Sequence, residues 1–476
     1  MARARLRFLS REEQDLIHQK SLEILSEIGV LVRSPTVLQR LERAGTNVDL
    51  HSGIVRIPEA IVASAVRQAP KRLLLAARDP KHDLRVPVDS FPFISTDGLS
   101  VYTTDLETGA KRGTARADLA MYARLADALE PVSFFWPQVT ASEVPQAAHT
   151  VHELWVSLVN CTKHIQGDSV SAADARAQVD LASQVVGGRE ELRKRPIISV
   201  TLCPIAPLSF EKGAVEAQLE FARAGIPVSS MSMCLGGLSS PVTLAGMIAT
   251  ANAENLASLV ITQSAAPGAP HIYASESTPM DPVLGKINYS APEVPLVCAG
   301  LAQMAERYGL PAMIGQWGVN GKEPGMPVSF SEVYSVVATT LAGGDMCSGM
   351  GGLEDAKGAS LEQMVIDAHL WENCRALLRE FAVTEETIGM DALRDVGHGN
   401  MFLSHPHTRR NLRKELFFRD KKKLVWESTF SVGMVPEARA EVRRLLRDHA
   451  VPALDRDILR TGDEFLRAFE RQVAAS

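Results

Sequence analysis

Aromatic side chains follow several predicted strands of this chain, at the point where each strand ends. Trp136, Tyr273 and Trp317 stand at three such ends, in a chain with only 5% aromatic residues. The face of an aromatic ring attracts a quaternary ammonium ion by about 0.5–2 kcal/mol. The three rings together therefore predict a cage for such a cation, whereas ordinary packing is the alternative for any one of them.

Acidic groups accompany these rings. Glu276 follows one predicted strand directly and could balance the charge of a bound cation. Asp281 could do the same, pair with Lys286, or brace its own loop through backbone hydrogen bonds. Glu254 interrupts an otherwise apolar helical pattern, so a buried Glu254 must have a hydrogen-bonding partner. A structural tie is the expected role for Glu254.

Other chemical motifs are incomplete. His405 and His407 resemble a two-histidine metal clip, but no carboxylate or cysteine stands at ligand spacing. The cysteines are scattered without a C-x-x-C pair, which argues against a zinc ribbon and a disulfide framework. The stretch from Asp367 to His369 matches the start of the cobalt-ligating D-x-H-x-x-G signature, but Glu372 occupies the glycine position. The sequence therefore predicts no bound metal and no cobalamin held tightly by the chain itself.

Strand ends can form one site only if a scaffold brings them together. The candidate strands are residues 132–140, 163–168, 197–203, 227–233, 271–275, 311–316 and 344–348. Helical patterns separate them, so strand and helix alternate along the chain. Seven alternations fit an α/β fold of the (β/α)₈, or TIM, barrel type better than an open sheet, and the active site of such a barrel lies at the carboxyl ends of its strands. We expect the eighth strand after the helical pattern at 360–380.

Two further sections flank the predicted barrel. Residues 1–113 read as an N-terminal helical cap followed by a short β-rich stretch at 83–113. Residues 114–407 form the predicted TIM-barrel catalytic domain. Residues 408–476 are charged and helical, and we expect them to form a C-terminal extension packed on the barrel.

Composition excludes some classes of protein. A net charge of −6 argues against a nucleic-acid binder, and the 46% hydrophobic fraction can build a large core. The N-terminus lacks the apolar segment of a signal peptide, and no run of about 18 apolar residues predicts a membrane span. We therefore expect a cytoplasmic protein, and a homo-oligomer because large barrels often associate.

Several short segments, in order along the chain, resemble one known family. They are residues 17–25, 105–112, 237–246, 253–257, 267–270, 365–367 and 402–408. They include GLSSPVTLAG at 237–246 and FLSHPHT at 402–408, and the ordered set rather than any single motif is specific. The chain is similar to the trimethylamine methyltransferase family of corrinoid-dependent methyltransferases over nearly its whole length. The resemblance implies a TIM barrel that passes a methyl group from an amine to the Co(I) of a separate corrinoid protein, which supplies the cobalamin.

The chain departs from that family at one chemically important position. Founding members carry pyrrolysine just after the sixth strand, whereas this chain has the common residues Gln316, Trp317 and Gly318 in that region. Family members without pyrrolysine include demethylases of glycine betaine and similar quaternary amines. A quaternary nitrogen already has a neutral tertiary amine as leaving group, so no general acid is required. We therefore expect a quaternary amine of the glycine betaine type as substrate.

The resemblance and the strand-end residues together give a set of expected roles. Aromatic rings contact the ammonium, Glu276 balances its charge, and Lys286 or Lys357 receives a substrate carboxylate. The expected catalytic residues are Gln316, Trp317 and Glu276. The expected substrate-binding residues are Trp136, Tyr273, Phe135, Asp281, Lys286 and Lys357.

Two other readings compete with this one. The first is a metal-dependent barrel hydrolase or lyase that uses His405, His407, Asp281 or Asp355. The second is a protein that binds a methylated amine without catalysis, since the loss of pyrrolysine could mean the loss of methyl transfer.

Overall fold

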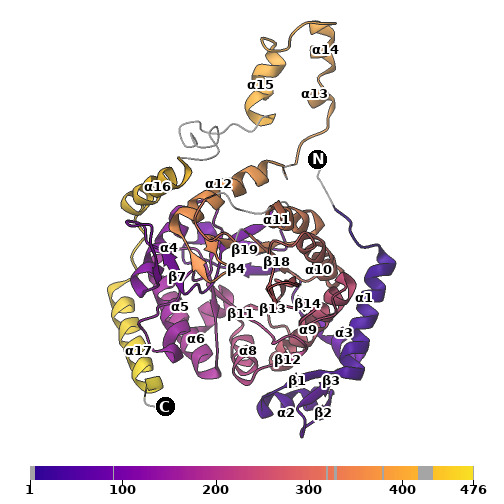
Figure 1. The fold of residues 1–476 in the computed structure, drawn as a ribbon, viewed down its shortest axis with the longest axis vertical. Helices are drawn as coiled ribbons and strands as arrows, with labels where there is room; N and C mark the ends of the chain where they lie inside the picture. Colours follow the sequence, from indigo (N-terminus) through magenta and orange to yellow (C-terminus); the bar gives the residue numbers. More distant parts are fainter. Residues whose placement is uncertain are drawn as a thin grey trace.

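A closed barrel of parallel strands forms the centre of the molecule (Figure 1). The computed structural model describes residues 6–88, 91–317, 320–325, 330–377, 380–415 and 433–474. The barrel strands, in order around the barrel, are β6 (Phe93–Thr96), β9 (Phe134–Phe135), β10 (His164–Asp168), β11 (Ile198–Leu202), β13 (Val228–Ser232), β15 (His271–Ser275), β18 (Ala312–Gln316) and β19 (Met346–Met350). Strand β19 pairs with β6 and closes the ring.

One helix follows each barrel strand and covers its outer face. These helices are α4 (Arg116–Ala128), α5 (His149–Asn160), α6 (Ala172–Val186), α8 (Lys212–Ala224), α9 (Leu244–Ala265), α10 (Val294–Tyr308), α11 (Phe330–Ala342) and α12 (Leu361–Leu377). Two large apolar clusters fill the space between the strands and this helical layer. The predicted (β/α)₈ barrel is confirmed.

Seven of the eight strands lie where the sequence predicts them, but the prediction of an eighth strand after residues 360–380 is wrong. The eighth strand is β6, within the β-rich stretch 83–113, so the N-terminal section contributes one strand to the barrel. Strand β6 has only four residues, and its partner β19 lies about 250 positions later, with Cys347 opposite Ile94. A segment this short shows no periodicity from which burial on both faces could be read.

The N-terminal section otherwise matches the prediction. Helix α1 (Arg11–Glu23) begins with a capping box between Ser10 and Glu13. Helices α2 (Pro35–Arg43) and α3 (Glu59–Gln68) flank the hairpin of β2 (Asn47–Asp49) and β3 (Ile54–Arg56). This cap packs on α9 and α10 in one apolar cluster. The hairpin of β4 (Leu73–Leu75) and β5 (Leu84–Val86) contributes leucines and a valine to the cluster inside the barrel.

Helix α9 is the one described helix that is long and apolar enough to cross a membrane, with a mean hydropathy of 1.3. Its position explains this composition, because 83% of the apolar window is buried inside the molecule. The cap helices cover its outer side and the barrel covers its inner side. A helix that is apolar all round is what such a central position requires.

After α12 the chain forms an arm of short helices that project from the barrel, followed by two helices that pack on it. Helix α16 (Met434–Asp448) joins the core cluster through Met434 and Val442, and α17 (Arg456–Ala474) packs on α5 and α6. Trp155 donates its indole N–H to Asp463 at 2.8 Å. Helices α13 (Glu385–Ile388), α14 (Met390–Val396) and α15 (Pro406–Glu415) project away from the barrel (Figure 1).

Strand β6 gives a direct test of this architecture. The Ile94 side chain is fully buried between barrel and helices, so Ile94→Ala should lower the free energy of unfolding by about 2–5 kcal/mol. The exposed neighbour Val101 is the control, and Val101→Ala should change it by less than about 0.5 kcal/mol. Denaturant unfolding followed by circular dichroism measures both. Equal, small effects would mean that β6 is not part of the core.

Candidate functional site

Three acidic side chains lie near one another inside the barrel, at the carboxyl ends of its strands. Asp97 directly follows β6, Asp168 ends β10, and Glu276 directly follows β15. Asp97 and Glu276 are 2% and 6% exposed. Parallel barrel strands place their carboxyl ends at one rim, which brings these distant residues together.

Burial controls the protonation of this carboxyl trio. The pKa of Glu276 is raised to about 8. Desolvation is the largest cause of this rise, and the nearby charges of Asp97 and Asp168 contribute to it. Desolvation also raises the pKa of Asp168 to about 7 and that of Asp97 to about 6. No lysine or arginine of the described ranges opposes these shifts. Glu276 therefore keeps its proton near pH 7, Asp168 is divided between its two forms and Asp97 is mostly ionised. A bound cation would favour the ionised form of all three.

One neighbouring donor holds each carboxyl group. Gln316 donates to Asp97 Oδ1 at 3.0 Å, and Ser348 Oγ donates to Glu276 Oε1 at 2.6 Å. The Trp136 indole N–H donates to Asp168 Oδ2 at 2.6 Å.

The Trp136 indole itself has little freedom. A Cβ atom at Gly98 would lie 2.5 Å from this ring, so only glycine lets the loop after β6 pack against it. The indole is therefore fixed between Gly98 and Asp168.

Buried polar atoms without a protein partner gather at the same end. They include Asp97 Oδ2, Gln316 Oε1, Gln166 Oε1, Thr201 Oγ1 and both amide atoms of Gln138, none of which bonds to another described residue. Buried polar atoms generally need a partner, so these mark where a ligand or solvent must bind. The amide and hydroxyl groups make the wall polar as well as acidic.

Two further residues lie within reach of the charges of the trio. Cys203, which follows β11, is exposed. Desolvation and then the charges of Asp168, Glu276 and Glu254 raise the pKa of its thiol. Tyr289, which follows β17 (Lys286–Ile287), is 5% exposed, and burial followed by the charges of Glu276 and Asp97 raises the pKa of its phenol. Both side chains therefore face the carboxyl trio.

The predicted aromatic cage does not form. Trp136 belongs to the cluster inside the barrel, whereas Phe135, Tyr273 and Trp317 belong to the clusters between barrel and helices. Tyr273 donates to Asn252 Oδ1 at 3.1 Å, and Trp317 meets Trp371 edge to face at 6.1 Å. Successive strand residues point to opposite faces, so Tyr273 points outward while Ala274 and Glu276 point inward.

The predicted residues of the rim lie outside the carboxyl trio. Asp281, at the end of β16 (Thr278–Asp281), accepts hydrogen bonds from the backbone N–H groups of Val283 and Leu284. These bonds match the alternative in which Asp281 braces its own loop. Lys286 pairs with Asp355 at 2.6 Å, and Lys357 is exposed.

Glu254 has the structural role that was expected, because its buried carboxylate is hydrogen-bonded to two neighbouring segments. It accepts hydrogen bonds from Ser232 Oγ at 2.6 Å and from the backbone of Leu208 at 2.8 Å. Both partners lie on segments that follow or belong to neighbouring strands, so this carboxyl joins α9 to the barrel.

The residues of the alternative metal site are scattered. His405 and His407 lie on the projecting arm, whereas Asp281 and Asp355 lie at the rim of the barrel. Among the described residues no three histidine, cysteine, aspartate or glutamate side chains come together as metal ligands.

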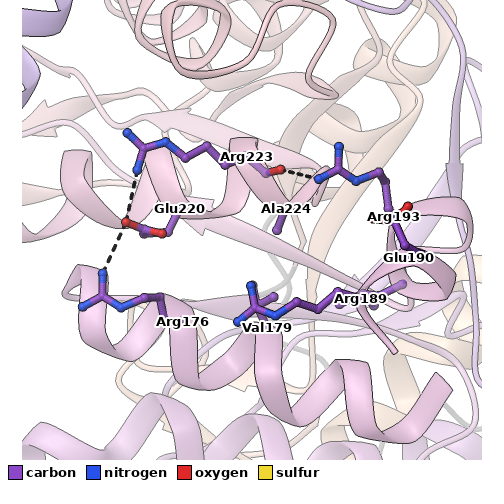
Figure 2. Close-up of a pocket in the computed structure, with 9 residues that line it drawn as sticks. Arg176, Val179, Arg189, Glu190, Arg193, Glu220, Arg223 and Ala224 are labelled. Carbon is purple, nitrogen blue, oxygen red and sulfur yellow. Dashed lines mark hydrogen bonds and ion pairs between the residues drawn. The ribbon is translucent and has the colours of Figure 1, made fainter. Parts of the chain in front are cut away.

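A separate cleft of about 290 Å³ opens on the outer surface between α6, α8 and α7 (Arg189–Lys194). Arg176 and Arg223 approach Glu220 at 3.3 Å, and Arg193 donates to the backbone oxygen of Arg223 at 2.8 Å (Figure 2). Helix α7 leads into the start of β11, so the cleft lies at the amino end of the strands, away from the carboxyl trio.

The sequence pattern indicates Glu276, Gln316 and Trp136, but it assigns no role to Asp97, Asp168 or Tyr289. Asp97 is not predicted because the strand before it is too short to be assigned to the barrel from the sequence. The signal was present, since an Asp-Gly pair directly follows four strand-forming residues. Tyr289 lies in a loop without regular pattern, and only the tertiary structure brings it to the site.

The fold and this strand-end site define a TIM-barrel enzyme. The crystal structure of the monomethylamine methyltransferase MtmB of Methanosarcina barkeri has the same fold, with a TM-score of 0.55 at 12% identity over 93% of this chain and 88% of that one.

Sequence relationships then give the family. The trimethylamine methyltransferase (MTTB) model matches residues 2–474, so the chain belongs to the trimethylamine methyltransferase family and is an enzyme of the methyltransferase type. It is 32% identical to the trimethylamine methyltransferase MttB of Methanosarcina thermophila over 471 residues, 96% of each chain. It is 26% identical to a glycine betaine methyltransferase of Desulfitobacterium hafniense over 98% of this chain and 96% of the relative.

The carboxyl trio should be visible in the pH dependence of stability. The raised pKa of about 8 means that folded Glu276 keeps a proton that the unfolded chain loses near pH 4.5, so stability should fall as the pH rises from about 4.5 to 8. Glu276→Gln should make this decline shallower in denaturant unfolding measured at several pH values. The exposed Glu130→Gln should leave the slope unchanged. Identical slopes for all three proteins would contradict a buried, protonated Glu276.

Proposed function

We propose that this protein transfers a methyl group from a cationic methylated amine to the Co(I) centre of a separate corrinoid protein, without pyrrolysine. The observation that carries the proposal is the carboxyl trio, buried at the carboxyl end of the barrel with no lysine or arginine among the described groups that shift its pKa values. Membership of the trimethylamine methyltransferase family supports the reaction class.

A buried acidic pocket favours a cationic methyl donor. Moving an ammonium ion out of water costs several kcal/mol, and carboxylates at hydrogen-bonding or contact distance offset that cost. When the cation binds, its charge lowers the pKa values of Asp97, Asp168 and Glu276, and the site releases protons. The substrate is then held by ionised carboxylates in a site of low dielectric constant.

The reaction needs little further chemistry from the protein. The methyl carbon–nitrogen bond breaks, its electron pair stays on nitrogen, and a neutral tertiary amine leaves without a proton. The two electrons for the new bond come from Co(I), which the partner supplies as a strong nucleophile. The barrel contributes positioning, with Trp136 against the donor and Gln316 and Ser348 orienting two of the carboxyl groups.

The rim of the barrel suits a protein partner. Exposed apolar side chains occur in five of the loops that follow barrel strands, and they are Val101, Val170, Ile205, Leu238, Val283 and Leu284. Apolar residues gathered round a site are typical of a docking surface. A corrinoid protein seated there would bring its cobalt toward the mouth of the pocket.

The charges around the site also affect which group the amine donor can carry on its tail. A betaine carries a carboxylate, which we expected Lys286 or Lys357 to bind. Lys286 is already paired with Asp355 at 2.6 Å. A betaine carboxylate that binds Lys286 would therefore require this pair to open, whereas Lys357, the other expected partner, is exposed. A quaternary ammonium ion with a neutral tail needs no such rearrangement, so we expect it to be the better donor.

The first experiment mixes the protein with a reduced corrinoid protein and a panel of amines. Tetramethylammonium, choline, glycine betaine and trimethylamine are supplied in turn, and the visible spectrum reports the conversion of Co(I) to methyl-Co(III). We expect conversion with a quaternary amine, fastest with a neutral tail. Binding of an amine without conversion, with a competent corrinoid protein present, would instead support the non-catalytic reading.

Glu276 should matter more than an acid at the rim. Glu276→Gln removes one ionisable partner of the cation and should lower kcat/KM at least ~tenfold, which corresponds to about 1.4 kcal/mol. Asp281→Asn, which affects only the loop brace at the rim, is the matched control and should stay within about twofold of wild type.

The binding of the amine should also depend on pH in a defined direction. Because cation binding ionises the trio, affinity in calorimetry should rise between pH 6 and 8, with proton release. Affinity that falls over this range would contradict the carboxylate role.

A further inference from the structure

Residues 382–415 form an arm that has almost no contact with the other described residues. Helices α13, α14 and α15 make up this arm, which projects away from the barrel in Figure 1. Its hydrogen bonds and ion pairs are all local or internal to the arm, such as the pair of Arg394 with Asp391 at 2.7 Å and the contact of His405 with Asp395 at 3.5 Å. Only Ala392 is buried among these residues.

The arm exposes many large apolar side chains. They are Val383 (63% exposed), Ile388 (53%), Met390 (43%), Leu393 (49%), Met401 (83%), Phe402 (37%), Leu403 (79%) and Leu412 (36%). Their exposed fractions equal more than four fully exposed side chains, which at about 180 Å² each is on the order of 800 Å². A stable dimer commonly buries about 800 Å² on each partner, so the arm alone offers the area of an interface.

No other element of the described chain supports the helices of the arm. The three helices have 4, 7 and 10 residues, and isolated helices shorter than about 12–15 residues are marginal in water. Few internal contacts join its two ends, namely that of His405 with Asp395 and the close approach of the His407 ring to Gly389. A segment with one buried side chain has no core of its own, so packing from outside must stabilise it.

This requirement identifies the kind of partner. A partner that comes and goes, such as a corrinoid protein that carries methyl groups, would leave the arm unfolded between encounters. A permanent partner keeps it folded, and permanent interfaces are the more hydrophobic ones. We propose that the arm, residues 382–415, packs against a second copy of this chain and builds a homo-oligomer in which each copy receives the arm of another.

Charge fits the same arrangement. Helix α15 carries Arg409, Arg410, Arg413 and Lys414 against the single acid Glu415, whereas the whole chain has a net charge of −6. The basic face of α15 therefore meets an acidic neighbour when it packs on another copy. The apolar side chains supply the area, and the charges help to fix the orientation.

The mass of the protein in solution tests this proposal. Wild type should elute with at least twice the mass of one chain in size-exclusion chromatography with light scattering. The arm variant Val383→Ser, Met401→Ser, Leu403→Ser should show at least a twofold lower mass with the far-ultraviolet circular dichroism of the barrel retained. The matched control replaces equally exposed apolar residues at the rim, Leu238→Ser, Val242→Ser and Val283→Ser, and should keep the wild-type mass. A monomeric wild type, or an arm variant with unchanged mass, would overturn the proposal.

A second measurement does not depend on any variant. Wild-type chains labelled with ¹⁴N and ¹⁵N are mixed, dissociated, reassembled and cross-linked through lysines, and Lys414 on α15 is the reporter. We expect peptides that join Lys414 of one isotope to the other isotope. Cross-links from Lys414 within single chains only would count against an arm that reaches a second copy.

Discussion

The site depends on the burial of the carboxyl trio, beside which the described residues place no basic group. Desolvation favours the neutral form of each acid, and the groups also repel one another once ionised. The site therefore holds protons when it is free and exchanges them for a cation. Asp97, Asp168 and Glu276 each receive one hydrogen bond from a fixed side chain, so their oxygens point in set directions before any substrate arrives.

The barrel creates this constraint through the geometry of its strands. Inward positions near the amino ends include the apolar side chains of Met313 and Met346, which pack with the leucines of the β4–β5 hairpin. Asp97, Asp168 and Glu276 instead stand where their strands end. The carboxyl end of the barrel is therefore the acidic end. Loops with exposed apolar residues surround that end, and this combination fits an enzyme whose second reactant is carried by another protein.

Separate parts of the chain meet separate physical requirements. The barrel with its N-terminal cap has a continuous core and supports the site. The arm of residues 382–415 has no core, so its stability depends on a neighbour. The cleft of arginines between α6, α7 and α8 lies at the other end of the strands, where its cations are largely satisfied by Glu220, Asp180 and backbone oxygen.

The sequence by itself determined the barrel and seven of its strands, because repeated strand and helix patterns are local and long enough to read. It also placed Glu276, Gln316 and Trp136 at strand ends, and the structure brings them to one rim. It could not supply β6, whose four residues are strand only because β19 and β9 pair with them. Nor could it tell that Tyr273 and Trp317 face the helices, since the side a residue takes depends on register and on where each strand ends. Protonation of the carboxyl trio was likewise decided by the tertiary structure alone, because burial and the distances between charges exist only after distant strands have closed into a barrel.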